Sequence, residues 1–178
     1  MDTTDTLAIT QMLRTEFVDV PDIAEALRIL LRLSLALALG FVLGYERESH
    51  GKAAGVRTHM LVAMGAALFV LLPQQMGIAA ADMSRVVQGL VAGVGFLCAG
   101  TILKAEASEQ VRGLTTAAGL WLTAAIGMAC GLGREVTALI ATLLSLGVFA
   151  LVPLLIKSEP PARDAGVVAA EDGAPPGR

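Results

Sequence analysis

The chain is organised as five long apolar stretches, separated by short segments that carry most of the charged residues. A helix that crosses the hydrocarbon core of a bilayer needs roughly 20 mostly apolar residues, and each stretch is close to that length. The pattern predicts five transmembrane helices, at 24–45, 58–81, 86–103, 113–133 and 136–156. The second could instead end near Leu72, because Pro73-Gln74-Gln75 follows.

The start of the first helix is marked by polar residues. Asp22 and Glu25 have the spacing of a capping box, in which the first residue accepts a hydrogen bond from the backbone of the third residue after it. Arg28 and Arg32 enter the early turns of this helix. They are four residues apart, so they share one face and are able to extend to the same membrane interface.

The segments before and after the apolar stretches are polar. Residues 1–23 are interpreted either as an extracytoplasmic amphipathic helix on the membrane surface or as a flexible terminus. Their acidic character is the opposite of a secretory signal, so we expect no cleaved signal peptide. Residues 157–178 contain four prolines and are too few and too polar to bury a core. We expect them to form a disordered cytoplasmic tail.

Composition supports a membrane protein. Hydrophobic residues make up 55% of the 178 residues and charged residues only 16%, against about 25% charged in soluble domains. We therefore expect an all-α polytopic membrane helix bundle, with residues 24–156 as the transmembrane domain. The net charge of −3 offers no basic surface for nucleic acid. Cys98 and Cys130 lie inside apolar stretches without metal or redox spacing, so no cofactor is expected and no metal is assigned.

The distribution of Lys and Arg predicts the orientation in the bacterial inner membrane. Eight lie in the 46–57 loop, the 104–112 loop and the tail, and five lie on the opposite side. The side richer in Lys and Arg is normally cytoplasmic. The chain is therefore expected to begin outside and end in the cytoplasm.

Glycine is concentrated where helices are expected to pack, because small residues let helix backbones approach closely in lipid. The residues concerned are Gly40 and Gly44 in the first stretch and Gly89, Gly93, Gly95 and Gly100 in the third. Their density predicts that the third helix lies at the centre of the bundle. Such faces also serve self-association, so a homo-oligomer and a membrane-protein partner both stay open beside the lipid bilayer.

Charges near the first two loops are placed against the helix dipole. Glu46 and Glu48 fall at the carboxyl end of the first helix, and Arg57 and Arg112 fall at amino ends. Each such placement costs about 0.3–1 kcal/mol near a surface. We hypothesise that Glu46 or Glu48 forms an ion-pair network with Arg57 and Arg112 at the cytoplasmic membrane edge. The alternative is a solvated loop whose charges only set topology.

Three segments, taken in order, resemble the MgtC/SapB family of membrane proteins. They are residues 44–48 with 52–63, residues 93–103, and residues 111–118 with 121–127. The resemblance covers roughly residues 25–155. It implies a bacterial inner-membrane protein linked to growth under magnesium limitation and, in pathogens, to survival inside host cells. The family's motif residues correspond to Glu46, Arg47, Glu48, Arg57, Thr58, Arg112, Thr115 and Thr116.

Longer members of the family carry a soluble cytoplasmic domain, and we expect this chain to be a short member without one. Two classes of function then stay open. The first class is a non-enzymatic membrane protein that acts through its cytoplasmic loops. The second is a small divalent-cation transporter or channel, which usually needs carboxylates at membrane depth, and the last three stretches contain none.

An enzyme is not expected. His50 and His59 have no Cys, Ser or Asp partner in a recognisable catalytic arrangement. We expect His59 to be a capping or packing residue.

Overall fold

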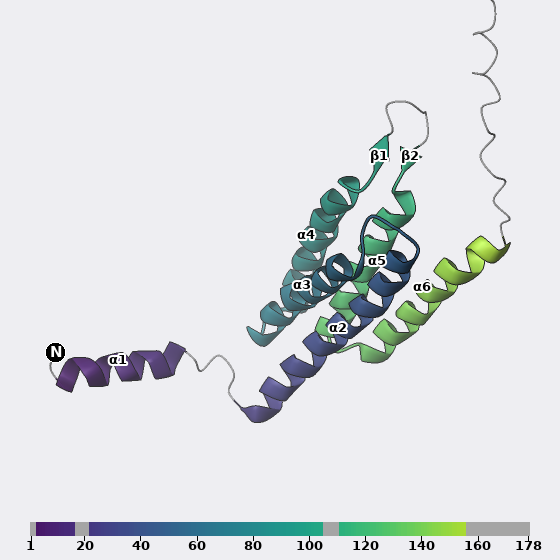
Figure 1. Ribbon diagram of the computed structural model, residues 1–178. Coiled ribbons are helices and arrows are strands. Elements are labelled where there is room, and N and C mark those ends of the chain that lie inside the picture. The colour runs from purple at the N-terminus through teal and green to yellow at the C-terminus, as the bar shows by residue number, and fades with distance from the viewer. Residues whose placement is uncertain (1–2, 17–21, 105–110, 156–178) are drawn as a thin grey trace, which may run out of the picture.

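The computed structural model describes residues 3–16, 22–104 and 111–155 (Figure 1). A first helix, α1, spans Thr3–Glu16. The longer helices are α2 (Ile23–Ser49), α3 (Val56–Gln75), α4 (Ala80–Ala99), α5 (Leu114–Gly131) and α6 (Glu135–Leu155). Between α4 and α5, two-residue strands β1 (Leu103–Lys104) and β2 (Val111–Arg112) pair antiparallel, with Leu103 opposite Arg112. Five of the described helices, α2 to α6, are long and apolar enough to cross a membrane, as predicted.

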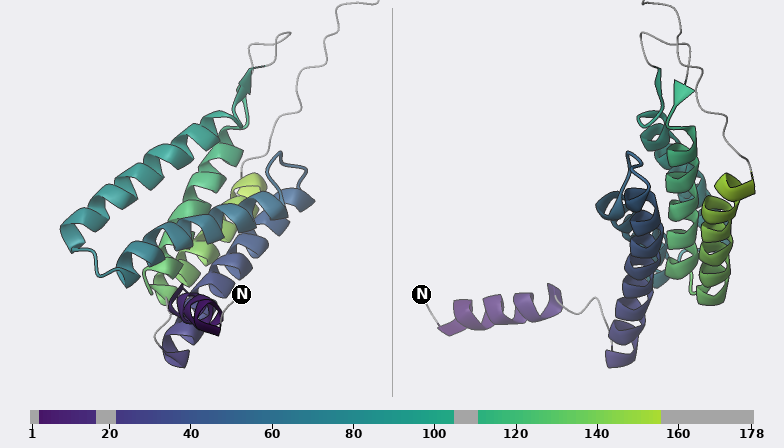
Figure 2. Two further views of the ribbon diagram at one scale, coloured as in Figure 1. Left: turned by 90° about the vertical axis from the view of Figure 1, so that its left-hand side faces the viewer. Right: turned by 45° about the vertical axis from the view of Figure 1, so that its right-hand side comes forward.

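Successive helices of the bundle alternate in direction. The loop between α2 and α3, the β1–β2 pair and the last turn of α6 therefore lie at one end, which we call the hairpin end (Figures 1 and 2). The start of α2 and the tight turns before α4 and α6 lie at the opposite end, which we call the turn end. α3 continues through Pro73 and ends at Gln75, so its end is closer to the shorter predicted form, which stops near Leu72, than to the longer one, which stops at residue 81.

The central helix is α5, not the predicted third span. α5 packs against α2, α3, α4 and α6, and ten of its residues are buried. In α4 only Val94 and Cys98 are buried. A methyl group added at Gly89, Gly93 or Gly95 would meet open space. The prediction was wrong because a glycine-rich face permits close packing but does not itself attract a neighbouring helix.

Close packing occurs at other glycines. A Cβ atom at Gly40 would lie 2.8 Å from the carbonyl oxygen of His59, and one at Gly44 would lie 2.6 Å from Cα of Val56. At this glycine pair the backbones of α2 and α3 therefore lie close together. Gly127 and Gly131 do the same for α5, since a Cβ there would overlap backbone atoms of α3.

Arg32 joins four elements at the turn end. Its Nη1 donates to Oε1 of Gln74 (2.9 Å) and to the carbonyl of Gly131 (3.2 Å), and its Nε lies 3.9 Å from a carboxylate oxygen of Glu135. A cation at the last carbonyls of α5 also complements that helix dipole. Arg28 instead pairs with Glu25 on the surface. The two arginines thus have different roles, although they lie on one helix face.

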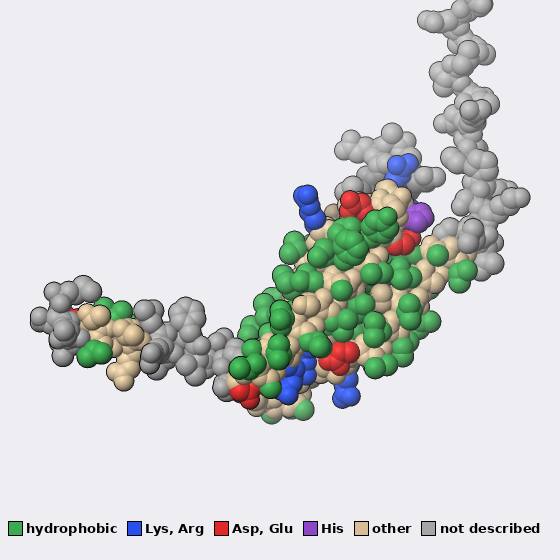
Figure 3. Space-filling model, turned by 60° about the horizontal axis from the view of Figure 1, so that its bottom comes forward, with side chains coloured by type: hydrophobic (Ala, Val, Ile, Leu, Met, Phe, Trp, Pro, Cys, Tyr) green, Lys and Arg blue, Asp and Glu red, His purple; other side chains and the backbone are tan. Residues whose placement is uncertain are grey.

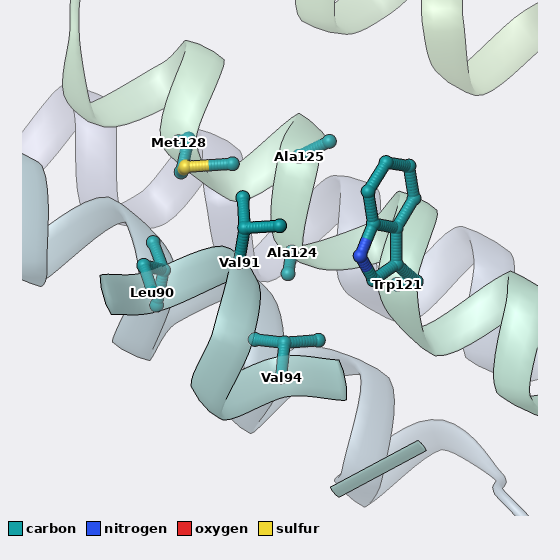
Figure 4. Close-up of a pocket in the computed structure, with 7 residues that line it drawn as sticks. All are labelled: Leu90, Val91, Val94, Trp121, Ala124, Ala125 and Met128. Atoms are coloured by element: carbon teal, nitrogen blue, oxygen red, sulfur yellow. The ribbon is translucent and has the colours of Figure 1, made fainter. Parts of the chain in front are cut away.

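The outer flank of the bundle is apolar, with charged side chains gathered toward its two ends (Figure 3). Large apolar side chains on three of the described helices, such as Phe69, Phe96 and Leu143, are mostly exposed. An apolar surface this extensive is expected to face lipid chains. A small hollow lies between α4 and α5 and is lined by Val91, Val94 and Trp121 among others (Figure 4).

The structure tests only some of the predictions made for the segments before and after the bundle. Asp22 caps α2 as predicted, because its Oδ1 accepts from the backbone N–H of Glu25 at 2.6 Å. α1 is a helix, and its position relative to a membrane stays a prediction. The expected disordered tail, 157–178, lies outside the described residues.

Candidate functional site

The hairpin end begins where α2 terminates in a Schellman motif. Gly51 has a φ of +64°, its N–H donates to the carbonyl of Glu48 (3.0 Å), and the N–H of Lys52 donates to the carbonyl of Arg47 (3.0 Å). Glycine at position 51 adopts this left-handed conformation without a side-chain clash. The motif holds the last turn of α2 in place, which fixes Glu46, Arg47 and Glu48 relative to the following loop.

Glu48 crosses that loop to the start of α3. Its Oε2 accepts a hydrogen bond from the backbone N–H of Val56 at 2.8 Å. A Cβ atom at Gly55 would overlap this carboxylate, so glycine leaves the space that Glu48 occupies. A negative charge that is unfavourable at the end of one helix is thereby moved to the positive end of the next.

The predicted ion-pair network is therefore wrong in its partners. In the described part of the chain, neither Glu46 nor Glu48 forms an ion pair with Arg57 or Arg112. Both arginines are exposed, and water screens the dipole penalty that the network was expected to relieve. The helix-dipole argument identified the right carboxylates but not the backbone amide that receives Glu48.

The carboxylate of Glu46 lies close to two other side chains. Its Oε2 lies 3.6 Å from Nη1 of Arg47, and its Oε1 lies 3.2 Å from Nδ1 of His50. His50 also approaches the carbonyl of Glu46 (2.8 Å), which places its ring over the last turn of α2. The Glu46 carboxylate is mostly buried, whereas His50 is exposed.

Arg47 is the most deeply buried charge at this end. Its side chain is 4% exposed, and its Cζ lies 4.4 Å from the ring centroid of Phe149 on α6. This contact is a cation–π stack between the first and last spans. Among the described residues, Nε and Nη2 of Arg47 have no hydrogen-bond partner, and neither has Oε2 of Glu46. The family motif led to Arg47, but the sequence did not indicate Phe149.

His59 completes the arrangement from α3. It is 1% exposed, its Nδ1 lies 3.0 Å from the carbonyl of Gly55, and its Nε2 is also without a partner in the described structure. A Cβ atom at Gly119 of α5 would lie 3.8 Å from that Nε2 and 3.3 Å from Cζ of Phe149. We call Glu46, Arg47, His59 and Phe149 the buried charge cluster. His59 is a packing residue, as expected, and it is also part of this cluster.

The other predicted site residues lie around the cluster. Thr116 is buried on α5 and Thr58 is half-buried on α3, whereas Thr115 is exposed. In the described residues, no group of three or more His, Cys, Asp or Glu side chains is arranged to hold a metal ion. The buried charge cluster keeps the charged and polar groups of Glu46, Arg47 and His59 away from water. None of its four side chains is a Ser, Thr, Cys or Lys nucleophile.

Comparison with known proteins places this architecture. The sequence pattern of the family described as "MgtC family" matches residues 33–157 of the chain. SrpB of Synechococcus elongatus is 48% identical over 126 residues, which cover 65% of this chain and 69% of SrpB. MgtC of Salmonella typhimurium is 44% identical over 117 residues, which cover 66% of this chain and 49% of MgtC.

YhiD of Escherichia coli K12 is 41% identical over 130 residues, which cover 67% of this chain and 60% of YhiD. The chain thus spans about half the length of MgtC and about 60% of YhiD. No solved structure matches it. The matched region runs from α2 to the end of α6 and contains the whole buried charge cluster, and on this match the chain belongs to the MgtC family.

Proposed function

We propose that this chain is a non-enzymatic inner-membrane protein that supports growth under magnesium limitation, and that it acts through the hairpin end, which faces the cytoplasm. The observation that carries the proposal is the buried charge cluster. Charged side chains are costly to bury, and in membrane proteins they usually mark functional positions. Here they lie at the hairpin end of the bundle, beside the loop between α2 and α3.

The relatives support the link to magnesium. One relative, YhiD, carries the name of a candidate magnesium transporter. Each of the three relatives named above is identical to this chain at two-fifths or more of the residues aligned with it. Since the chain spans only about half of MgtC, the activity of the full-length relatives is proposed here only for the part held in common.

Transport of a divalent cation is the alternative that the name of YhiD favours. A cation path through the bundle needs acidic side chains or unwound backbone at depth. In the described residues of α2 to α6, the acidic side chains lie near helix ends. They are Glu25, Glu46, Glu48, Asp82 and Glu135. This distribution supports a protein that acts at the membrane edge over one that conducts ions.

A matched pair of variants tests the proposal. Arg47→Lys keeps the buried charge but loses the planar guanidinium, whereas Arg57→Lys makes the same change at an exposed position. In a strain that depends on this protein, we expect Arg47→Lys to abolish growth in low magnesium at normal membrane abundance, and Arg57→Lys to grow normally. Equal growth of both variants would contradict the proposal. Mg²⁺ flux through the purified protein in liposomes would favour transport instead.

A further inference from the structure

The guanidinium of Arg47 has two edges with different surroundings. Its Nη1 faces the carboxylate of Glu46 at 3.6 Å. Nε and Nη2 lie along the opposite side edge, and these two nitrogens are the ones with no hydrogen-bond partner among the described residues. Each of them donates a hydrogen in the plane of the group, and the two donors run nearly parallel.

The free edge has the geometry that binds oxyanions. Two parallel N–H donors match two oxygens of a carboxylate or a phosphate group. The stack on Phe149 fixes the plane of the guanidinium, so the orientation of this edge is set before any ligand arrives. Because the side chain is nine-tenths buried, leaving both donors unpaired is unfavourable.

The other unpartnered atoms distinguish between the two oxyanions. Nδ1 of His59 faces a carbonyl oxygen, so it carries the hydrogen, and Nε2 of the neutral ring is an acceptor. Oε2 of Glu46 is an acceptor as well. Because Glu46 lies at the Nη1 side, a ligand on the free edge must accept from Arg47 and donate to the acceptor that His59 contributes. A carboxylate only accepts, whereas a phosphate group that bears a hydroxyl does both.

We propose that the buried charge cluster binds a hydroxyl-bearing phosphate group, with the side edge of Arg47 on two phosphate oxygens and a ligand hydroxyl on Nε2 of His59. Two sources have this chemistry at a membrane edge: the phosphoglycerol headgroup of an anionic lipid and free hydrogen phosphate. The inference deepens the proposed function and rests on it only in taking the hairpin end as the working end. Binding is measured on purified protein and growth in cells, so either can fail without the other.

The test uses the full chain, purified in detergent and depleted of lipid. The probes are phosphatidylglycerol in phosphatidylcholine vesicles, phosphatidylcholine vesicles alone, inorganic phosphate, and acetate and chloride at matched ionic strength. We expect the phosphatidylglycerol vesicles, inorganic phosphate, or both to raise the melting temperature of the wild type above all the other probes. Arg47→Lys should weaken that binding at least tenfold, while Arg57→Lys should change it less than twofold.

Each outcome decides the proposal. A response to phosphatidylglycerol alone identifies a lipid headgroup, and a response to inorganic phosphate alone or to both identifies the phosphate group itself as the ligand. An equal or larger response to acetate or chloride overturns the proposal, as does equal binding by wild type and Arg47→Lys. If Arg47→Lys does not fold, native mass spectrometry of the wild type replaces it. Retention of a phosphate-bearing species then supports the site, and its absence overturns it.

Discussion

Arg47 and Phe149 connect the first and last spans of the bundle, since the guanidinium carbon of Arg47 lies 4.4 Å from the centre of the Phe149 ring. The two residues are about a hundred positions apart in the chain, on α2 and α6. The contact covers one face of a buried cation with an aromatic surface. It therefore holds α6 against the hairpin end at the point where the candidate site lies.

The first prediction concerns this stack. Phe149→Leu keeps an apolar side chain but removes the ring face, so it should lower the free energy of unfolding by about 1–2 kcal/mol. Phe149→Tyr retains the ring face and should lose less. The control is Val148→Ala, at a neighbouring position that is 58% exposed, which should be close to neutral. Thermal unfolding in detergent measures all three, and equal effects of the Leu and Tyr variants would contradict a role for the ring.

The second prediction separates glycines that pack from glycines that do not. An added Cβ at Gly127 would overlap the carbonyl of Ala63, so Gly127→Ala should destabilise the bundle by roughly 1–3 kcal/mol. Gly93→Ala should be neutral or stabilising by up to about 1 kcal/mol, because the site is open and alanine favours helix. Membrane abundance and thermal unfolding provide the measurements. If Gly93→Ala destabilised the protein more than Gly127→Ala, the result would support α4 as the central helix.

The third prediction concerns the carboxylate that caps α3. Glu48→Ala removes the acceptor of the Val56 N–H and should cost about 1 kcal/mol, with faster hydrogen exchange at that amide. Lys52→Ala, in the same loop, should leave exchange at Val56 unchanged. Arg57→Ala should be neutral or slightly stabilising, since it removes a positive charge from the amino end of a helix. A clear destabilisation by Arg57→Ala would instead support the predicted ion-pair network, which the described residues do not form.

The fourth prediction tests the orientation. Single cysteines are introduced at Lys52 in the hairpin-end loop and at Met76 in the turn before α4, both of which are exposed. In spheroplasts, a membrane-impermeant maleimide should label the Met76→Cys protein, and should label the Lys52→Cys protein only after permeabilisation. The parent protein controls for Cys98 and Cys130, which are buried. Labelling of Lys52→Cys in sealed spheroplasts would place the candidate site outside the cell.

Local signals in the sequence determined the helices themselves. Five apolar stretches of membrane-spanning length correspond to α2 to α6, because the hydropathy and length of a segment are properties of that segment alone. The cap at Asp22 is equally local, since donor and acceptor lie three residues apart. Gly51, in the turn after α2, carried a similar signal, because glycine is the usual residue at the left-handed position that ends a helix. The family motif, likewise, identified Glu46, Arg47 and Glu48 from residues close together in the chain.

The tertiary structure alone decided which helices are neighbours and which charges meet. His59 lies four positions before the buried Ala63 and on the same face, so the sequence could have indicated that it points inward. It could not indicate that the same space is bordered by Phe149 and Gly119. Nor could it show that α5, rather than α4, occupies the centre. Apolar length and helical period describe one helix at a time, whereas neighbours depend on how all the surfaces fit together in space.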